Sequence, residues 1–260
     1  MTTNLRSTFL ILTIAAAGMG ALLAFLPAAG HDQLWCLYVA RHVLDGTPLY
    51  GPELMESNPP LIIWLSMLPV ALAQFLHIPA PAVGKTLVIL LEAFIAAVCL
   101  RQLRRTVALN PTQLSALAFA FVTLFNVVPA RDLGQRDDLL ALLCLPYLLA
   151  AALRPSPTRG APYLTASSSC MASNDAFTST LEQTLIGLTA GLGLALKPHQ
   201  ALLPLAVEFY LVFRARSLRP LLRPEPFALL AVAVAYFAAI HSLTPNYLTT
   251  LLPVLRDTYW

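Results

Sequence analysis

The sequence predicts an all-α polytopic membrane protein with about seven transmembrane helices. Hydrophobic residues make up 58% of the 260 residues and charged residues only 11%, whereas an ordinary soluble domain has about 45–50% and about 25%. Mean hydropathy is +0.71, and the apolar stretches run continuously instead of alternating as in a membrane β-barrel. A cytosolic enzyme, a disordered chain and a small disulfide-linked scaffold are excluded, because too few polar side chains remain to cover a soluble surface.

Seven apolar segments are predicted to cross the bilayer, because about 20 apolar residues span its hydrocarbon core. They cover residues 8–29, 82–100, 112–129, 139–153, 181–196, 199–213 and 226–243. The first segment exceeds the roughly 7–15 apolar residues of a signal peptide. It is therefore interpreted as a retained anchor, although Ala28-Ala29-Gly30 also resembles a cleavage site. Residues 154–180 form a loop rich in Pro, Ser, Thr and Ala.

Two further helices are predicted between the first and second of these segments. Residues 30–59 are the most polar stretch of the first half. The apolar positions from Gln33 to Leu44 fit an amphipathic helix that lies in the membrane interface and ends at Asp45-Gly46. Residues 60–78 are apolar but interrupted by Pro69. They therefore either cross the bilayer or lie flat on it.

Basic residues constrain the topology, because cytoplasmic loops are enriched in Lys and Arg. Three clusters fall on every second loop and are expected to be cytoplasmic; they are Arg101, Arg104 and Arg105, then Arg154 and Arg159, then Arg214, Arg216, Arg219 and Arg223. If residues 60–78 lie flat, the N-terminus is cytoplasmic and there are seven spans. If they cross, the N-terminus is outside and there are eight. Both arrangements place ten basic residues inside and six outside, so charge alone leaves both open.

Four polar groups at the ends of the apolar segments are candidates for chemistry. They are His31-Asp32, Glu56 and Asn58 within residues 53–60, the Arg/Asp-rich residues 131–138, and Lys197-Pro198-His199. Each also has a plain structural interpretation. Asp32 suits an N-cap for the helix that begins near Gln33, the next two groups suit solvated loops, and Lys197 suits a side chain that extends to the interface.

Two carboxylates within the predicted spans, Glu92 and Glu208, are functional candidates because charge inside a bilayer is costly. Glu208 lies close in sequence to the third arginine cluster, so a structural ion pair explains it at least as well. Glu92 is expected to face the helix bundle and either accept a hydrogen bond or be protonated.

Two classes of site are not indicated by the sequence. The four cysteines, Cys36, Cys99, Cys144 and Cys170, are scattered singly and form no CxxC pair, which argues against a zinc site and against a disulfide framework. The net charge is only +3 and no run of basic residues is dense, so no nucleic-acid partner is expected.

In their order and spacing, the polar motifs resemble the GT-C superfamily of membrane glycosyltransferases, and in particular its bacterial branch related to protein O-mannosyltransferases and aminoarabinose (lipid A) transferases. The motifs that carry the resemblance are Asp32, Tyr38-Val39-Ala40-Arg41, residues 44–50, Asn58-Pro59-Pro60-Leu61, and the charged residues at 101–105 and 131–138. The resemblance implies that the Pro-Pro-Leu motif opens a juxtamembrane helix rather than a span, which favours seven spans.

The implied arrangement is a single GT-C-like module over residues 1–260. Its first loop, residues 30–80, is extracytoplasmic and carries amphipathic juxtamembrane helices, and its loop 154–180 is cytoplasmic. Two departures from the family pattern stand out: Asp32 has no adjacent acidic residue, and Asn58 stands where aminoarabinose transferases carry a basic residue. Because family members usually continue past the seventh span, the chain is expected to be a truncated or minimal member, or part of something longer.

The resemblance also implies a function and a location. A sugar would pass with inversion from a polyprenyl-phosphate donor to an extracytoplasmic glycan, lipid or protein, in the bacterial inner (cytoplasmic) membrane. The acceptor hydroxyl must lose a proton, which calls for a carboxylate, and the leaving phosphate calls for cations. The candidate catalytic residues are Asp32, Asp137 and Glu56, and the candidate phosphate-binding residues are Arg131, Arg136, Lys197 and His199.

No cofactor is required by the sequence. The three candidate carboxylates offer oxygen ligands for Mg or Mn, but no ligand spacing establishes such a site. Membrane lipids are expected partners of any arrangement. Two other classes stay open: a non-catalytic GT-C-like scaffold or subunit of a larger membrane complex, and a small-solute transporter, which would be built from inverted repeats.

Overall fold

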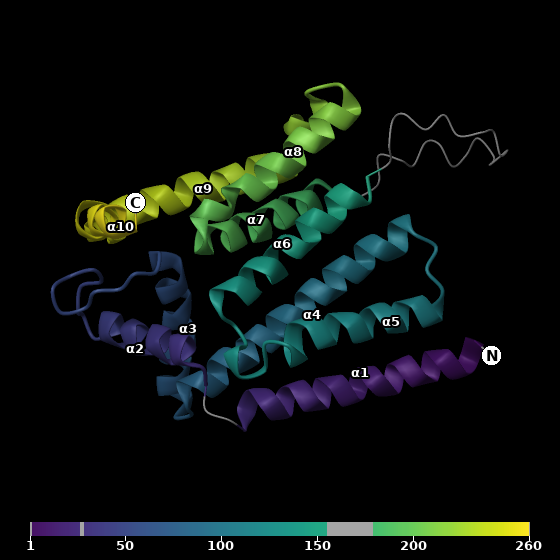
Figure 1. The fold of residues 1–260 in the computed structure, drawn as a ribbon, viewed down its shortest axis with the longest axis horizontal. Coiled ribbons are helices and arrows are strands. Elements are labelled where there is room, and N and C mark those ends of the chain that lie inside the picture. The colour runs from purple at the N-terminus through teal and green to yellow at the C-terminus, as the bar shows by residue number, and fades with distance from the viewer. Residues whose placement is uncertain (1, 27–28, 155–178, 260) are drawn as a thin grey trace.

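The computed structural model describes residues 2–26, 29–154 and 179–259, and among these residues it contains helices and no strand. Figure 1 shows the long helices side by side along one axis, with the first and the last helix reaching opposite ends of the molecule. Almost all of the expected cytoplasmic loop 154–180 lies outside the described residues.

Seven helices correspond to the predicted apolar segments within a few residues. They are α1 (Thr2–Phe25), α4 (Ala80–Thr106), α5 (Pro111–Val122), α6 (Arg136–Ala152), α7 (Thr180–Leu196), α8 (Leu202–Ala215) and α9 (Pro224–Leu243). A π-helical turn, η1 (Thr123–Val127), extends α5, and a 3-10 turn, η4 (Pro198–Ala201), precedes α8. A 3-10 turn, η5 (Arg219–Leu222), precedes α9. A π-helical turn, η6 (Tyr247–Leu251), and the short helix α10 (Leu252–Tyr259) follow α9.

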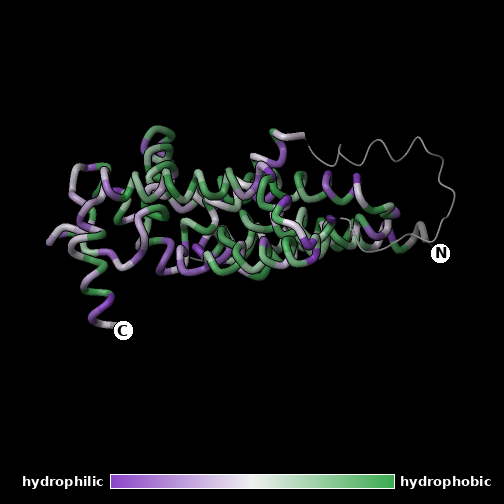
Figure 2. Tube along the Cα trace, turned by 90° about the horizontal axis from the view of Figure 1, so that it is seen from above, coloured by the Kyte–Doolittle hydropathy of each residue, from purple (hydrophilic) through white to green (hydrophobic). Residues whose placement is uncertain are grey.

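Three of these helices are long and apolar enough to cross a membrane by length and composition. They comprise Leu5–Phe25, Ala80–Thr106 and Pro224–Leu243. Many of the large side chains that face outward are also apolar: Ile11, Ile14, Phe209, Phe213 and Phe237 are each 63–76% exposed. Figure 2 shows hydrophobic residues along most of the length of the helices. Such a surface is unsuited to water, and it indicates a membrane protein.

Residues 30–78 form two helices at one end of the bundle, α2 (His31–Leu44) and α3 (Pro60–Leu76). Pro60 occupies the first turn of α3, where its missing N–H costs nothing. α3 packs against α2 and α4, and both short helices lie where α1 ends and α4 begins (Figure 1). At the opposite end α1 runs beside α5, with the Phe9 and Phe119 ring centroids 6.4 Å apart.

The suggested N-cap role of Asp32 is wrong. α2 begins two residues earlier than expected, at His31, so Gly30 holds the N-cap position and no side chain caps the helix. Asp32 lies within the first turn, where a negative charge favours the helix dipole. Its side chain is 71% exposed, so its carboxylate is not occupied by the helix backbone.

Two glycines four residues apart bring α7 into close contact with α9. A Cβ atom at Gly187 would overlap the Glu225 carbonyl oxygen, and one at Gly191 would lie 2.7 Å from Cβ of Val232. Small residues at this spacing are typical of helix packing in membranes, because they let two backbones approach.

Replacing Gly187 with Ala is expected to lower the free energy of unfolding by about 1–3 kcal/mol, the usual cost of overpacking, because the added methyl group must displace the α9 backbone. The measurement is denaturant-induced unfolding of the purified chain in detergent. Gly18→Ala is the matched control, since a Cβ there meets nothing within 4 Å. Equal stability of the two variants would contradict the close contact of α7 and α9.

Candidate functional site

Four segments that are distant in sequence meet at the end of the bundle that carries α2 and α3. The Gly30 N–H donates to the Arg131 carbonyl at 3.3 Å, and Gln33 Nε2 donates to the Leu133 carbonyl at 3.1 Å. Lys85 Nζ donates to the Ala24 carbonyl, which joins the start of α4 to the end of α1. The expected outer loop is therefore at the same end of the bundle as residues 131–136, as the arrangement with residues 60–78 lying flat requires.

Glycine is required where these segments cross. A Cβ at Gly30 would overlap the Asp132 carboxylate. Gly134 has a φ of +90°, a conformation that other residues rarely adopt, and a Cβ there would lie 2.8 Å from Val88 Cγ2. The turn between η1 and α6 is thereby pressed against both α2 and α4, which brings the start of α6 to the first loop.

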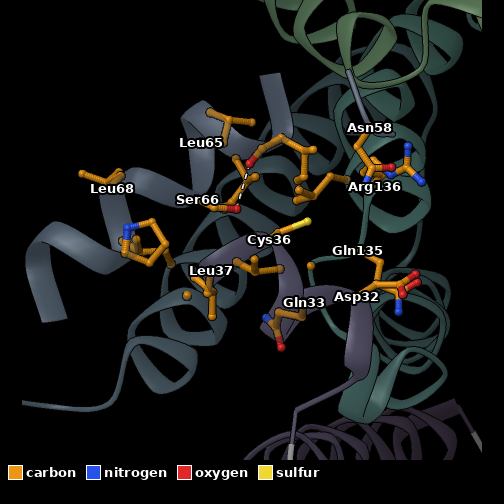
Figure 3. A pocket seen from close by; sticks show the side chains of 18 of the residues that line it. Asp32, Gln33, Cys36, Leu37, Asn58, Leu65, Ser66, Leu68, Gln135 and Arg136 are labelled. Carbon is orange, nitrogen blue, oxygen red and sulfur yellow. Dashed lines mark hydrogen bonds between the residues drawn. The ribbon is translucent and has the colours of Figure 1, made fainter. Parts of the chain in front are cut away.

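Two adjoining cavities share three polar residues at this end: Asp32, Asn58 and Arg136. The outer cavity, of about 400 Å³, is also lined by His31, Trp35, Glu56 and Ser57. The inner cavity, of about 250 Å³, continues past Cys36 between apolar side chains of α3 and α4 and reaches Gln135 and Asp137. Figure 3 shows Asp32 and Gln33 of α2, Asn58, and Arg136 of α6 around this opening, with the Cys36 side chain among them.

Glu56 is the most rigidly held carboxylate at the site. Its side chain is only 2% exposed, and both of its oxygens accept hydrogen bonds: Trp35 Nε1 donates to Oε2, and the Asn58 N–H donates to Oε1 at 2.7 Å. Asp32, by contrast, is open to solvent and lies 3.4 Å from His31 Nδ1. The site therefore pairs one buried, fixed carboxylate with one accessible carboxylate.

Of the candidate cations, Arg136 lines both cavities and makes no ion pair among the described residues. Lys197, which is 17% exposed, pairs with Asp137 on α6, so two of the sequence-predicted residues bind each other. Arg131 and His199 are exposed and line neither cavity. The structure thus gathers Asp32, Glu56 and Arg136, and sets Lys197 and Asp137 beside them.

A resident divalent cation does not fit these residues. Within the described part of the chain, no three His, Cys, Asp or Glu residues lie close enough to hold a metal ion. The oxygens of Glu56 are taken by Trp35 and Asn58, and Asp137 is engaged by Lys197.

The loop between α2 and α3 is anchored by Tyr50, the last residue of the 44–50 motif. Tyr50 is 1% exposed, its hydroxyl donates to the Asn58 carbonyl at 2.6 Å, and its ring centroid lies 5.2 Å from that of Tyr247. Burial raises the pKa of this phenol well above its ordinary value. Tyr50 thus fixes the segment that carries Glu56 and Asn58 against η6, the turn that follows α9.

Both carboxylates within the apolar segments have partners. Glu92 is 6% exposed and accepts a hydrogen bond from Asn126 Nδ2 at 3.4 Å. Glu208 accepts from the Tyr147 hydroxyl at 2.7 Å and pairs with Arg223 at 2.5 Å. The ion-pair interpretation of Glu208 is therefore confirmed.

A separate apolar groove of about 600 Å³ runs between α6, α7, α8 and α9. It extends from Pro198 and Tyr247 near the candidate site to Glu208 and Leu221 toward the other end.

Sequence reasoning did not single out several of these site residues. Trp35 follows Asp32 by three positions, so the two share a face of α2, and that spacing could have identified it. Cys36 follows Asp32 by four positions and so shares that face too. Gln135 lies within the candidate segment 131–138, and only Gln33 carries no such signal. These three residues reach the cavities only because the turn before α6 folds against α2 and α4.

In comparisons with protein-family models, with curated proteins and with solved structures, nothing matches this chain.

Burial and the charged residues of the site change the pKa of the Cys36 thiol. Burial, and after it the negative charge of Glu56, raise the pKa of this thiol to about 12 from its ordinary 9.0, while Arg136 lowers it and Asp32 raises it to smaller extents. Because only the thiolate reacts readily, a shift of three units leaves about a thousandfold less reactive thiolate at pH 8.

Alkylation of Cys36 by iodoacetamide is therefore expected to be slow at pH 8 and to quicken about tenfold for each pH unit below 12. The measurement is mass spectrometry of a variant whose other three cysteines are serine. A cysteine at the exposed position of Glu53, with Cys36 replaced by serine, is the control and should react about a thousandfold faster at pH 8. Similar rates at the two positions would contradict a buried Cys36 beside Glu56.

Proposed function

We propose that this chain is an integral membrane glycosyltransferase of the bacterial inner membrane. It moves a sugar from a polyprenyl-phosphate donor to an extracytoplasmic glycan, lipid or protein, with inversion. The observation that carries the proposal is the convergence of Asp32, Glu56 and Arg136 on one pocket, which offers an accessible base, an orienting carboxylate and a phosphate-binding cation together.

In the proposed orientation seven segments cross the membrane, and α2 and α3 lie along its outer surface. Two ion pairs support this arrangement, because Arg105 with Glu182 and Arg154 with Glu225 gather the arginine clusters at the end of the bundle opposite the pocket. Since clustered arginines favour the cytoplasm, the pocket faces outside.

In the proposed reaction Asp32 removes the proton from the acceptor hydroxyl as its oxygen attacks the anomeric carbon. The new carbon–oxygen bond forms on one face of the sugar while the bond to the phosphate oxygen breaks on the other, which inverts the configuration. The electron pair leaves with the polyprenyl phosphate, whose developing charge Arg136 stabilises. Glu56 keeps Trp35 and Asn58 in place at the rim of the pocket.

The apolar groove between α6, α7, α8 and α9 supports a donor with a long hydrocarbon tail. Its volume of about 600 Å³ and its apolar lining suit an isoprenoid chain. The groove begins at Pro198, the residue after Lys197, so a tail in the groove would bring its phosphate toward the cations of the site.

The sidedness of the pocket can be measured with single cysteines placed at Glu53 and at Arg104 in a cysteine-free background; both positions are exposed. A membrane-impermeant maleimide is expected to label the Glu53 position in intact cells, with the outer membrane permeabilised if there is one. It should label the Arg104 position only after lysis. The reverse pattern would place the pocket in the cytoplasm and exclude the proposed site.

Replacing Asp32 with Asn is expected to lower sugar transfer by about 10²–10⁴-fold, the usual contribution of a positioned base. The measurement is transfer in proteoliposomes from the polyprenyl-phosphate sugar that the unaltered protein uses, together with the envelope glycans of the cells. Asp45→Asn is the matched control, since this exposed carboxylate of the same loop pairs with Arg41 away from the pocket. Unchanged glycans in the Asp32→Asn cells would favour the non-catalytic scaffold instead.

A further inference from the structure

Four arginines line one cavity of about 600 Å³ at the end of the bundle opposite the candidate active site. They are Arg154, Arg214, Arg219 and Arg223, and the wall is completed by Leu211, Ala215, Ser217 and Pro220. The arginines come from three places in the chain: the end of α6, the end of α8, and the turn η5 with the residue that follows it. Arginines on a cytoplasmic loop help to set the orientation of the chain in the membrane wherever on that loop they stand. Membrane orientation alone therefore does not require these four arginines to line one cavity.

Two carboxylates hold two of these arginines in position. Glu225, only 1% exposed, pairs with Arg154, and Glu208 accepts two hydrogen bonds from Arg223, at 2.5 and 2.6 Å. Arg214 Nη2 donates to the Arg154 carbonyl at 2.9 Å. These contacts fix the direction of long side chains that would otherwise be mobile, and so reduce the entropy that a bound ligand would have to remove.

The cavity keeps an excess of positive charge. Glu225 and Glu208 offset Arg154 and Arg223, whereas Arg214 and Arg219 have no carboxylate partner among the described residues. In addition, the buried Nε of Arg154 has no hydrogen-bond partner in the described part of the chain. Burial, and after it the charge of Arg223, lower the pKa of Arg154, and the neighbouring Glu225 and Glu208 oppose this shift only in part.

We propose that this arginine pocket binds a phosphate group, carried either by an anionic phospholipid of the adjacent leaflet or by a soluble phosphate compound. The planar guanidinium group matches phosphate oxygens in a two-pronged geometry. Basic pockets between helices at the cytoplasmic surface suit lipid headgroups, and Leu211, in the last turns of α8, gives the wall an apolar side chain. The pocket is separate from the Asp32 site, so the inference is independent of glycosyl transfer.

The test removes the two arginines that carry no ion pair. Arg214→Gln with Arg219→Gln leaves the pairs of Glu225 and Glu208 intact. Arg6→Gln with Arg104→Gln is the matched control, because it removes two exposed charges from the same end of the molecule outside the pocket. The full chain in neutral detergent is titrated with phosphatidylglycerol, with phosphatidylcholine as the neutral reference, and separately with inorganic phosphate. Binding is read by native mass spectrometry and by melting temperature.

The pocket variant is expected to bind at least about tenfold more weakly than the unaltered chain, given the contribution of each basic residue to an anionic headgroup. The control should stay within about twofold. Loss of phosphatidylglycerol binding identifies the lipid source, and loss of binding to inorganic phosphate identifies the soluble source. If the double variant does not fold, Arg219→Gln alone, at an exposed position, should still weaken binding by about threefold. Equal loss in pocket and control variants, or no preference of the unaltered chain for either anionic ligand, would overturn the proposal.

Discussion

A charged side chain among apolar helices needs a partner, because removing an unpaired ion from water costs several kcal/mol. In this chain the charges inside the bundle meet that requirement locally. Glu92 accepts from Asn126, Glu208 pairs with Arg223, and Lys85 donates to a backbone carbonyl of α1. Most of the other charges lie at the two ends of the bundle. The cost of desolvating a charged side chain therefore confines charged sites to these ends.

The two ends of the bundle meet this requirement for charge pairing in different ways. At one end, a loop and two short helices cover the tips of the long helices, and the two carboxylates of the outer cavity differ in exposure, with Glu56 buried and Asp32 open. At the other end, buried carboxylates serve mainly to orient arginines. Helix α6 reaches both regions, with Arg136 in its first turn and Arg154 just beyond its last. A single rigid element thereby sets the position of a cation in each cavity.

The helices could be predicted from the sequence because long apolar runs and prolines at their ends are local signals. The charge pattern could not place residues 60–78, because both topologies distribute the basic residues equally. Only the resemblance favoured the flat arrangement, and the position of α3 depends on how it packs against α2 and α4. The site was predicted in part. Asp32, Glu56 and Arg136 could be predicted because they stand at the ends of apolar segments. The pair of Lys197 and Asp137, by contrast, joins residues 60 positions apart. No local pattern encodes that contact.

The geometry also separates the roles of the two carboxylates at the candidate site. Both Glu56 oxygens already accept donors from fixed groups, the indole of Trp35 and the backbone of Asn58, so a substrate proton would have to displace one of them. Asp32 is 71% exposed at the mouth of the same cavity, and a substrate hydroxyl can approach it without breaking the first loop. Because Trp35 lies on α2 with Asp32, the hydrogen bond to Glu56 fixes the helix that carries the base. In the proposed transferase Glu56 therefore acts by positioning, and Asp32 accepts the proton.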